Sequence, residues 1–173
     1  MDVIERNRMA QLLDAVREVD EIPAPEETEE RSGRAWLGVR GLGALAVLAV
    51  GIVHLQQYLK LYSAIPTIGT LFVLNFAGAT AIGLGLLAPV ERLLGRRRGN
   101  LALILLALAG IGLAATALVF LAIAEHTPLF GFMEPGYDPT AILVARIAEG
   151  TTVALLGAYL AARLAGAADR GWW

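Results

Sequence analysis

The chain has 173 residues, of which 57% are hydrophobic and 17% charged, and its formal net charge is -2. This balance is too apolar for an ordinary soluble domain and predicts a membrane protein. The near-neutral charge gives no reason to expect a nucleic-acid partner, and the absence of cysteine excludes disulfides, thiolate metal sites and cysteine nucleophiles.

The first segment, residues 1–36, is predicted to be a cytoplasmic extension. Apolar residues recur at helical spacing over residues 9–19, with Asp, Glu and Arg between them. This pattern favours an amphipathic helix within residues 1–20 that lies on the membrane or on a neighbour; a docking helix for a soluble partner or for self-association is the alternative. Residues 21–33 are acidic and contain proline, which predicts a flexible tether.

Four stretches are long and apolar enough to cross a bilayer as helices, which takes about 20 residues. They are residues 42–62, 68–87, 101–123 and 140–162. Together they define a membrane domain of residues 37–165, and residues 166–173 are predicted to be a cytoplasmic tail. Because the connecting loops are short, the sequence predicts an all-α, four-helix up-down bundle.

Basic residues flank the spans asymmetrically. Twelve arginines lie before the first span, between the second and third, or after the fourth, whereas Lys60 is the one basic residue predicted on the opposite side. The positive-inside rule therefore predicts a multi-pass protein of the cytoplasmic membrane with both termini in the cytoplasm.

Four polar side chains within the spans are the most informative: His54, Asn75, Arg146 and Glu149. With a rise of ~1.5 Å per residue, all four lie ~9–13 Å below the outer ends of their helices, so we expect one polar layer in the outer half of the membrane. Polar groups in hydrocarbon are costly unless they are paired. These residues are therefore the candidates for a ligand-binding site or a proton relay.

Two pairings are open within this layer. Arg146 and Glu149 are three residues apart, so they can form a structural ion pair on one helix face. Alternatively, Glu149 accepts a hydrogen bond from His54, which leaves Arg146 free for an anionic or carbonyl ligand. His54 itself is either a hydrogen-bonded interhelical residue or a ligand.

The outer loop, with the sequence EHTPLFGFMEPGYDPT, is predicted to be a lid over the mouth of the bundle. Three prolines stiffen it, and its aromatic residues give it an apolar underside. The alternative is an interfacial anchor whose aromatic rings lie among headgroups. The candidate lid residues are Glu125, His126, Phe130, Phe132, Glu134, Tyr137 and Asp138.

No nucleophile elbow, Walker loop or dinucleotide fingerprint occurs in the sequence, so no catalytic residue is predicted. Cofactors stay unknown. Haem ligation by His54 and His126 fits poorly, because the two histidines are predicted at different depths. A zinc site has the same two histidines and several carboxylates available, but no motif with metal-ligand spacing.

Three segments carry a resemblance to a known group of proteins: HLQQY from His54, IPTIGTLFVLN from Ile65 to Asn75, and LFGFME from Leu129 to Glu134. With an acidic residue in the last span, they resemble a pattern found in small four-span integral membrane proteins of actinobacteria, over about residues 40–165. The resemblance implies that these segments and Glu149 form one assembly on the outer face. It implies no activity, cofactor or catalytic residue, and it treats the arginine-rich inner loop and the N-terminal segment as incidental.

Three functions are compatible with these features. The leading hypothesis is a non-enzymatic membrane protein, an accessory subunit or binding module whose outer polar pocket takes a lipid headgroup, a quinone-like molecule or another amphipathic ligand. The second is a proton- or ion-coupled carrier that acts as a homo-oligomer, with Glu149 and His54 as the titrating pair. The third is a redox or metal-binding subunit of a larger membrane complex.

Overall fold

The computed structural model describes the backbone of residues 25–168 and the side chains of residues 36–165. The described part of the chain contains helices and no β-strand. Its elements are α2 (Pro25–Lys60), the 3-10 helix η1 (Tyr62–Ala64), α3 (Pro66–Leu87), α4 (Val90–Leu94), α5 (Arg96–Ala124) and α6 (Pro139–Ala168). The amphipathic helix predicted within residues 1–20 lies outside the described residues.

Four segments are long and apolar enough to cross a membrane. They are Trp36–Lys60, Pro66–Leu87, Arg96–Ala124 and Pro139–Ala165. All belong to one compact unit that starts at Trp36. The predicted all-α bundle with four membrane-spanning helices is therefore confirmed, with boundaries that differ from the predicted ones by a few residues.

The tether predicted for residues 21–33 is wrong from Pro25 onward, because α2 begins at that residue. Proline at the first helical position costs no hydrogen bond, and the acidic residues that follow it favour a helix N-terminus. No further proline or glycine occurs before Gly33. Acidic composition was therefore a poor guide to local structure in this segment.

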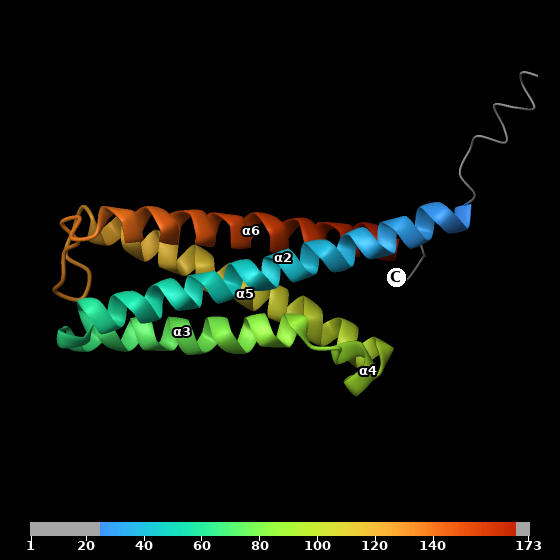
Figure 1. Ribbon diagram of the computed structural model, residues 1–173, viewed down its shortest axis with the longest axis horizontal. Helices are drawn as coiled ribbons and strands as arrows, with labels where there is room; N and C mark the ends of the chain where they lie inside the picture. The colour runs from blue at the N-terminus through green and yellow to red at the C-terminus, as the bar shows by residue number, and fades with distance from the viewer. Residues whose placement is uncertain (1–24, 169–173) are drawn as a thin grey trace, which may run out of the picture. The chain divides into compact units, whose positions relative to one another are not determined.

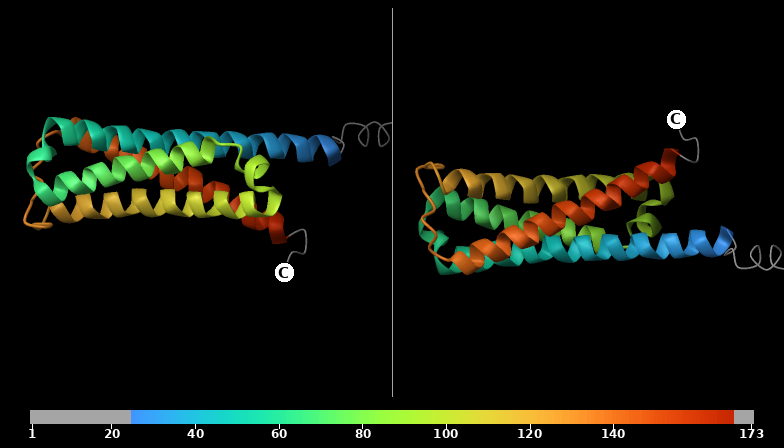
Figure 2. Two further views of the ribbon diagram at one scale, coloured as in Figure 1. Left: turned by 90° about the horizontal axis from the view of Figure 1, so that it is seen from below. Right: turned by 90° about the horizontal axis from the view of Figure 1, so that it is seen from above.

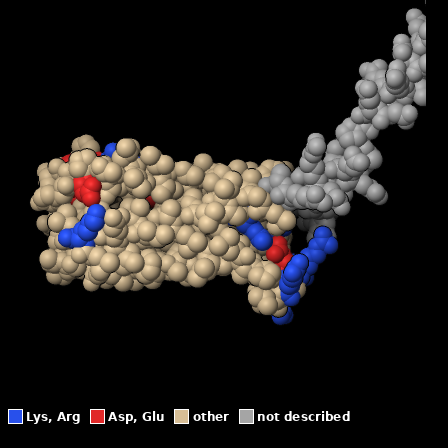
Figure 3. All heavy atoms as spheres, in the orientation of Figure 1, with Lys and Arg blue, Asp and Glu red and all other residues tan. Residues whose placement is uncertain are grey.

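The spans run back and forth, so the connections gather at two ends of the bundle (Figures 1 and 2). One end carries η1 and the α5–α6 loop, residues 125–138, and we call it the loop end. The other carries α4 between α3 and α5, and we call it the α4 end. On the face shown in Figure 3, charged side chains gather at these two ends.

Small residues let the helices approach closely in the half of the bundle toward the α4 end. A Cβ atom added at Gly83 of α3 would lie 3.2 Å from the carbonyl oxygen of Ala44 in α2, and one at Gly110 of α5 would lie 2.7 Å from the Leu156 side chain of α6. The core cluster lies in the same half and consists of Ala44, Val47, Ala79, Ile82, Leu86, Val90, Leu103, Ala107, Leu156 and Tyr159. This half of the bundle is packed with apolar side chains.

Candidate functional site

A cavity of about 410 Å³ lies in the loop-end half of the bundle. All four spans and the 125–138 loop line it, and most of the lining is apolar. Its polar lining residues are His54, Gln57, Tyr62, Asn75, Thr116, Glu134, Asp138 and Glu149. Three of the four residues predicted to form an intramembrane polar layer thus line one cavity, whose size falls in the range of small-molecule sites, ~300–1,000 Å³.

His54 and Glu149 face each other across α2 and α6. The distance from His54 Nε2 to Glu149 Oε1 is 3.8 Å, which is an ion-pair distance and too long for a hydrogen bond. His54 Nδ1 lies 2.9 Å from the carbonyl oxygen of Val50. Because a carbonyl can only accept, Nδ1 donates this bond, and Nε2 of a neutral imidazole must be an acceptor. The pair is therefore neutral when it holds one proton on its facing atoms, either on Glu149 or on His54 Nε2.

Two buried acceptor atoms, on residues that line this cavity, lack a hydrogen-bond partner. They are Glu149 Oε2 and Asn75 Oδ1. Glu149 is 1% exposed, so bulk water does not compensate its carboxyl group. Buried polar atoms in proteins almost always have a partner, and an unpaired one costs about 1–3 kcal/mol. The two orphaned oxygens therefore indicate a site built to receive hydrogen-bond donors.

Glu134 holds the loop over the cavity. It is 6% exposed, and its carboxylate accepts hydrogen bonds from the Tyr62 hydroxyl and from the backbone N–H groups of Gly136 (2.9 Å) and Tyr137 (3.1 Å). Its own N–H donates to the carbonyl oxygen of Ala124 at 2.8 Å. Burial, and then the bond to Glu134, raise the pKa of Tyr62 well above its ordinary value, so this hydroxyl stays a donor.

A tight turn brings one aromatic side chain of the loop, that of Phe132, onto the cavity. Leu129 and Phe132 exchange two backbone hydrogen bonds of 2.7 and 3.0 Å. The two residues between them, Phe130 and Gly131, have φ values of 53° and 79°, as a type I′ turn requires. Phe132 then packs edge-on against Tyr62 with ring centroids 5.7 Å apart. Of the candidate lid residues, Phe132, Glu134 and Asp138 line the cavity, and their role as a lid stays a prediction.

Asp138 fastens the other end of the loop. Its Oδ1 accepts from the backbone N–H of Ala141 at 3.0 Å, in the first turn of α6, and its Oδ2 accepts from Gln57 Nε2 at 3.1 Å. These two bonds, in that order, lower the pKa of Asp138 below its ordinary value of 3.8. Asp138 is therefore a helix cap that also joins α6 to α2.

We expect Asp138→Asn to reduce thermal stability at neutral pH by a modest amount, because a neutral amide is a weaker acceptor than a carboxylate. A lowered pKa in the folded state means that the carboxylate stabilises the fold above pH 3.8 and that this contribution is lost as the pH falls through the lowered pKa. The difference in melting temperature between the two proteins should therefore shrink below pH 3.8. A constant difference at all pH values would contradict the prediction.

Arg146 does not belong to the cavity. Its guanidinium pairs with the carboxylate of Glu125, and 46% of its side chain is exposed. The predicted Arg146–Glu149 pair is wrong, and so is the alternative in which Arg146 is free for a ligand. The physical reason is that the long arginine side chain reaches toward the surface, where its charge costs less than beside buried Glu149.

Other candidate lid residues also lie outside the cavity lining. His126, Phe130 and Tyr137 are exposed. Phe130 nevertheless contacts Phe120 of α5, a lining residue, with ring centroids 6.0 Å apart. His126 Nδ1 lies 2.9 Å from the carbonyl oxygen of Ala122 in α5, the helix that precedes it. The two histidines are thus not brought together for haem ligation. Among the described residues, no group of three or more His, Cys, Asp and Glu could hold a metal ion.

No protein-family model matches the chain, and neither a curated protein nor a solved structure is significantly similar to it. The resemblance to four-span actinobacterial proteins stays a prediction. The geometry of the chain's own residues therefore carries the functional argument.

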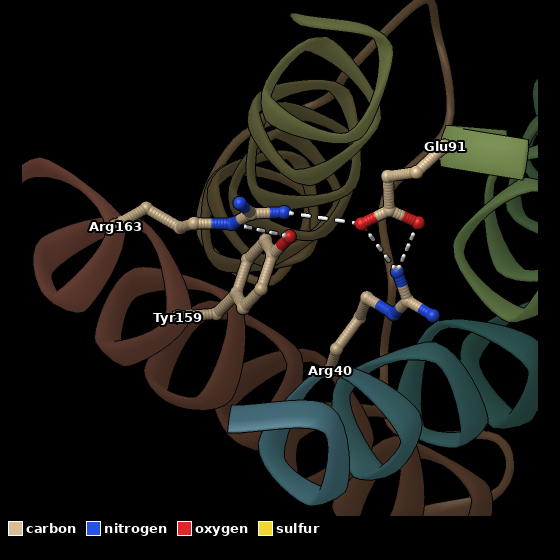
Figure 4. Close-up of polar contacts among 4 residues, drawn as sticks. All are labelled: Arg40, Glu91, Tyr159 and Arg163. Atoms are coloured by element: carbon tan, nitrogen blue, oxygen red, sulfur yellow. Dashed lines mark hydrogen bonds and ion pairs between the residues drawn. The ribbon is translucent and has the colours of Figure 1, made fainter. Parts of the chain in front are cut away.

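A second polar cluster, at the α4 end, was missed by the sequence analysis (Figure 4). Glu91 of α4 lies between two arginines: its Oε2 is 3.3 Å from Arg40 Nη1 of α2, and its Oε1 is 3.4 Å from Arg163 Nη2 of α6. Arg163 Nε also donates to the Tyr159 hydroxyl at 3.0 Å. The α3–α5 connection thus joins the first and last spans and is not incidental. The sequence signal was an acidic residue next to a run of arginines.

Proposed function

We propose that this protein is a non-enzymatic membrane protein that binds an amphipathic small molecule or a lipid headgroup in the loop-end cavity. The observation that carries the proposal is the pair of orphaned acceptors, Glu149 Oε2 and Asn75 Oδ1, in one cavity. The rest of the cavity lining is largely apolar. That combination suits a ligand with one polar end and one apolar end.

The position of the cavity favours binding over transport. The packed core cluster lies between the cavity and the α4 end, and each of its members is at most 9% exposed. No route for a ligand crosses that apolar half in one protomer. Binding within the outer half, in an accessory subunit or a binding module, needs no such route.

The orientation belongs to the same proposal. Twelve arginines on one side of the spans against one lysine on the other favour a cytoplasmic α4 end and an outward-facing loop end. Both termini are then cytoplasmic, in the cell membrane. The cavity would lie in the outer leaflet, within reach of lipids and of lipid-soluble molecules.

Native mass spectrometry of protein extracted gently from its host membrane tests the proposal. We expect a retained small-molecule or lipid mass on the unaltered chain. Asn75→Leu combined with Glu149→Gln should reduce occupancy by about tenfold or more, because each lost hydrogen bond contributes about 1 kcal/mol and one to a charged group about 1.5–3 kcal/mol.

The matched control for that experiment is Asn100→Leu. Asn100 Oδ1 is also buried without a partner, but Asn100 does not line the cavity. Its replacement should leave the retained mass in place. Equal loss from the control and from the double variant would contradict binding at the cavity.

A proton-coupled carrier is the second candidate, and the His54–Glu149 pair favours it because two buried titratable groups lie 3.8 Å apart. Since a single protomer offers no path past the packed core, this function requires a homo-oligomer. If the mass spectra show a homo-oligomer with no retained ligand, the carrier becomes the better candidate.

A further inference from the structure

The cavity lining is strongly biased toward one sign of charge. Three carboxyl groups line it, those of Glu134, Asp138 and Glu149, together with the imidazole of His54. The described lining includes no lysine or arginine. Arg146 is held by Glu125 outside the cavity. An anionic headgroup would therefore meet carboxylates without a compensating cation.

The carboxyl groups divide into two kinds. Glu134 and Asp138 accept hydrogen bonds from the loop, from η1 or from α2 and α6, so they are used to hold the structure together. Glu149 Oε2, like Asn75 Oδ1, accepts none. Both free positions are acceptors, on α6 and α3 respectively. A ligand that satisfies them must donate hydrogen bonds, and a donor that carries positive charge is favoured most.

The apolar part of the cavity extends to the surface between α3 and α5. Its lining includes Leu74, Gly112 and Thr116, all of which are exposed at the outside of the bundle. Figure 1 shows α3 and α5 diverging toward the loop end. The lining of the cavity thus reaches the outer surface of the spans between α3 and α5, where an apolar chain would meet the bilayer.

We propose that the cavity binds an amphipathic amine, with its ammonium group donating to Glu149 and Asn75 and its apolar chain lying between α3 and α5. This inference rests on the proposed function and names the ligand class for the same site. The shared chemistry is a primary ammonium group on an apolar body, which either a free lipophilic amine or the ethanolamine headgroup of a phospholipid supplies.

The test uses the full chain in an uncharged detergent and three probes with the same alkyl chain: dodecylamine, dodecanol and dodecyl sulfate. Binding is measured by isothermal titration. We expect dodecylamine to bind at least about tenfold more tightly than the other two, as a charge-assisted hydrogen bond allows. Glu149→Gln should remove that preference, because it keeps the side-chain shape and removes the charge.

Two glycines provide a matched pair of variants for the apolar part. A Cβ added at Gly112 or at Gly150 meets no other atom within 4 Å, so both positions have room for the first atom of a side chain. Gly112 lines the cavity and Gly150 does not. We expect Gly112→Phe to weaken dodecylamine binding by about tenfold or more and Gly150→Phe to leave it unchanged.

The outcomes separate this inference from the proposed function. If all three probes bind equally and Gly112→Phe weakens them all, the amine preference is wrong and the amphiphile site stands. If Gly112→Phe and Gly150→Phe bind every probe as the unaltered chain does, both fail. With the preference established, displacement of dodecylamine by phosphatidylethanolamine assigns the headgroup of a lipid, and a lack of displacement assigns a free amine.

Discussion

The substitution His54→Leu is expected to destabilise the bundle by about 1–3 kcal/mol, the cost of leaving a buried polar group without a partner. Glu149 is 1% exposed, and His54 is the group that forms an ion pair with it. Without the imidazole, the carboxyl group must stay neutral and unpaired in an apolar wall. The measurement is thermal unfolding of the full chain in detergent.

Two further variants make that experiment decisive. In His54→Leu combined with Glu149→Leu, stability should return to near that of the unaltered protein, because replacing a whole buried ion pair by apolar residues is often neutral. His126→Leu is the control, since His126 is exposed and its ring contacts a backbone carbonyl of the preceding helix α5. If His54→Leu melted at the same temperature as the unaltered protein, the His54–Glu149 pair would not contribute to stability.

The second large effect is expected from Gly99→Ala, at the start of α5. A Cβ atom at this position would lie 2.5 Å from the Cα and 2.8 Å from the backbone nitrogen of Glu91, and 2.9 Å from the carbonyl oxygen of Val90. All three are backbone atoms, so α4 as a whole must move. Overpacking of this kind costs about 1–3 kcal/mol, more than the ~1 kcal/mol that alanine gains over glycine in a helix.

Gly112→Ala is the matched control, because it lies in the same helix with no other atom within 4 Å of its added Cβ. It should melt at or slightly above the temperature of the unaltered protein. Gly99→Ala should melt below it, and the shift of α4 should also weaken the Arg40–Glu91 pair. If Gly99→Ala melted as Gly112→Ala does, the close packing of α4 against α5 would be disproved.

The helices were predictable because a membrane span is recognised from the mean hydropathy of about 20 residues, which one or two polar residues hardly change. That His54, Asn75 and Glu149 lie near one another was predictable for a different reason. A constant rise per residue places them at one level of the bundle, and all three line one cavity. Arg146 was predicted at the same level but does not line the cavity, because the level of a residue does not give the direction of a long flexible side chain. Its actual partner, Glu125, lies at the end of α5.

The α4 end was not predictable from composition. Arginines beside a membrane span are expected from the positive-inside rule alone. The sequence therefore contains no separate sign that Arg40 and Arg163 pair with a carboxylate. Their shared partner, Glu91, is 51 and 72 residues away in the chain from them. A contact over such separations depends on how four helices pack, which no local pattern encodes.

The Arg40–Glu91–Arg163 cluster also bears on how the protein is made. Its first two members are synthesised with the first two spans and the turn that follows them, whereas Arg163 comes at the end of the fourth. During synthesis the Arg40–Glu91 contact is thus available before the last two spans exist, and the Arg163 contact closes it afterwards. The complete cluster can therefore form only after all four spans have been synthesised.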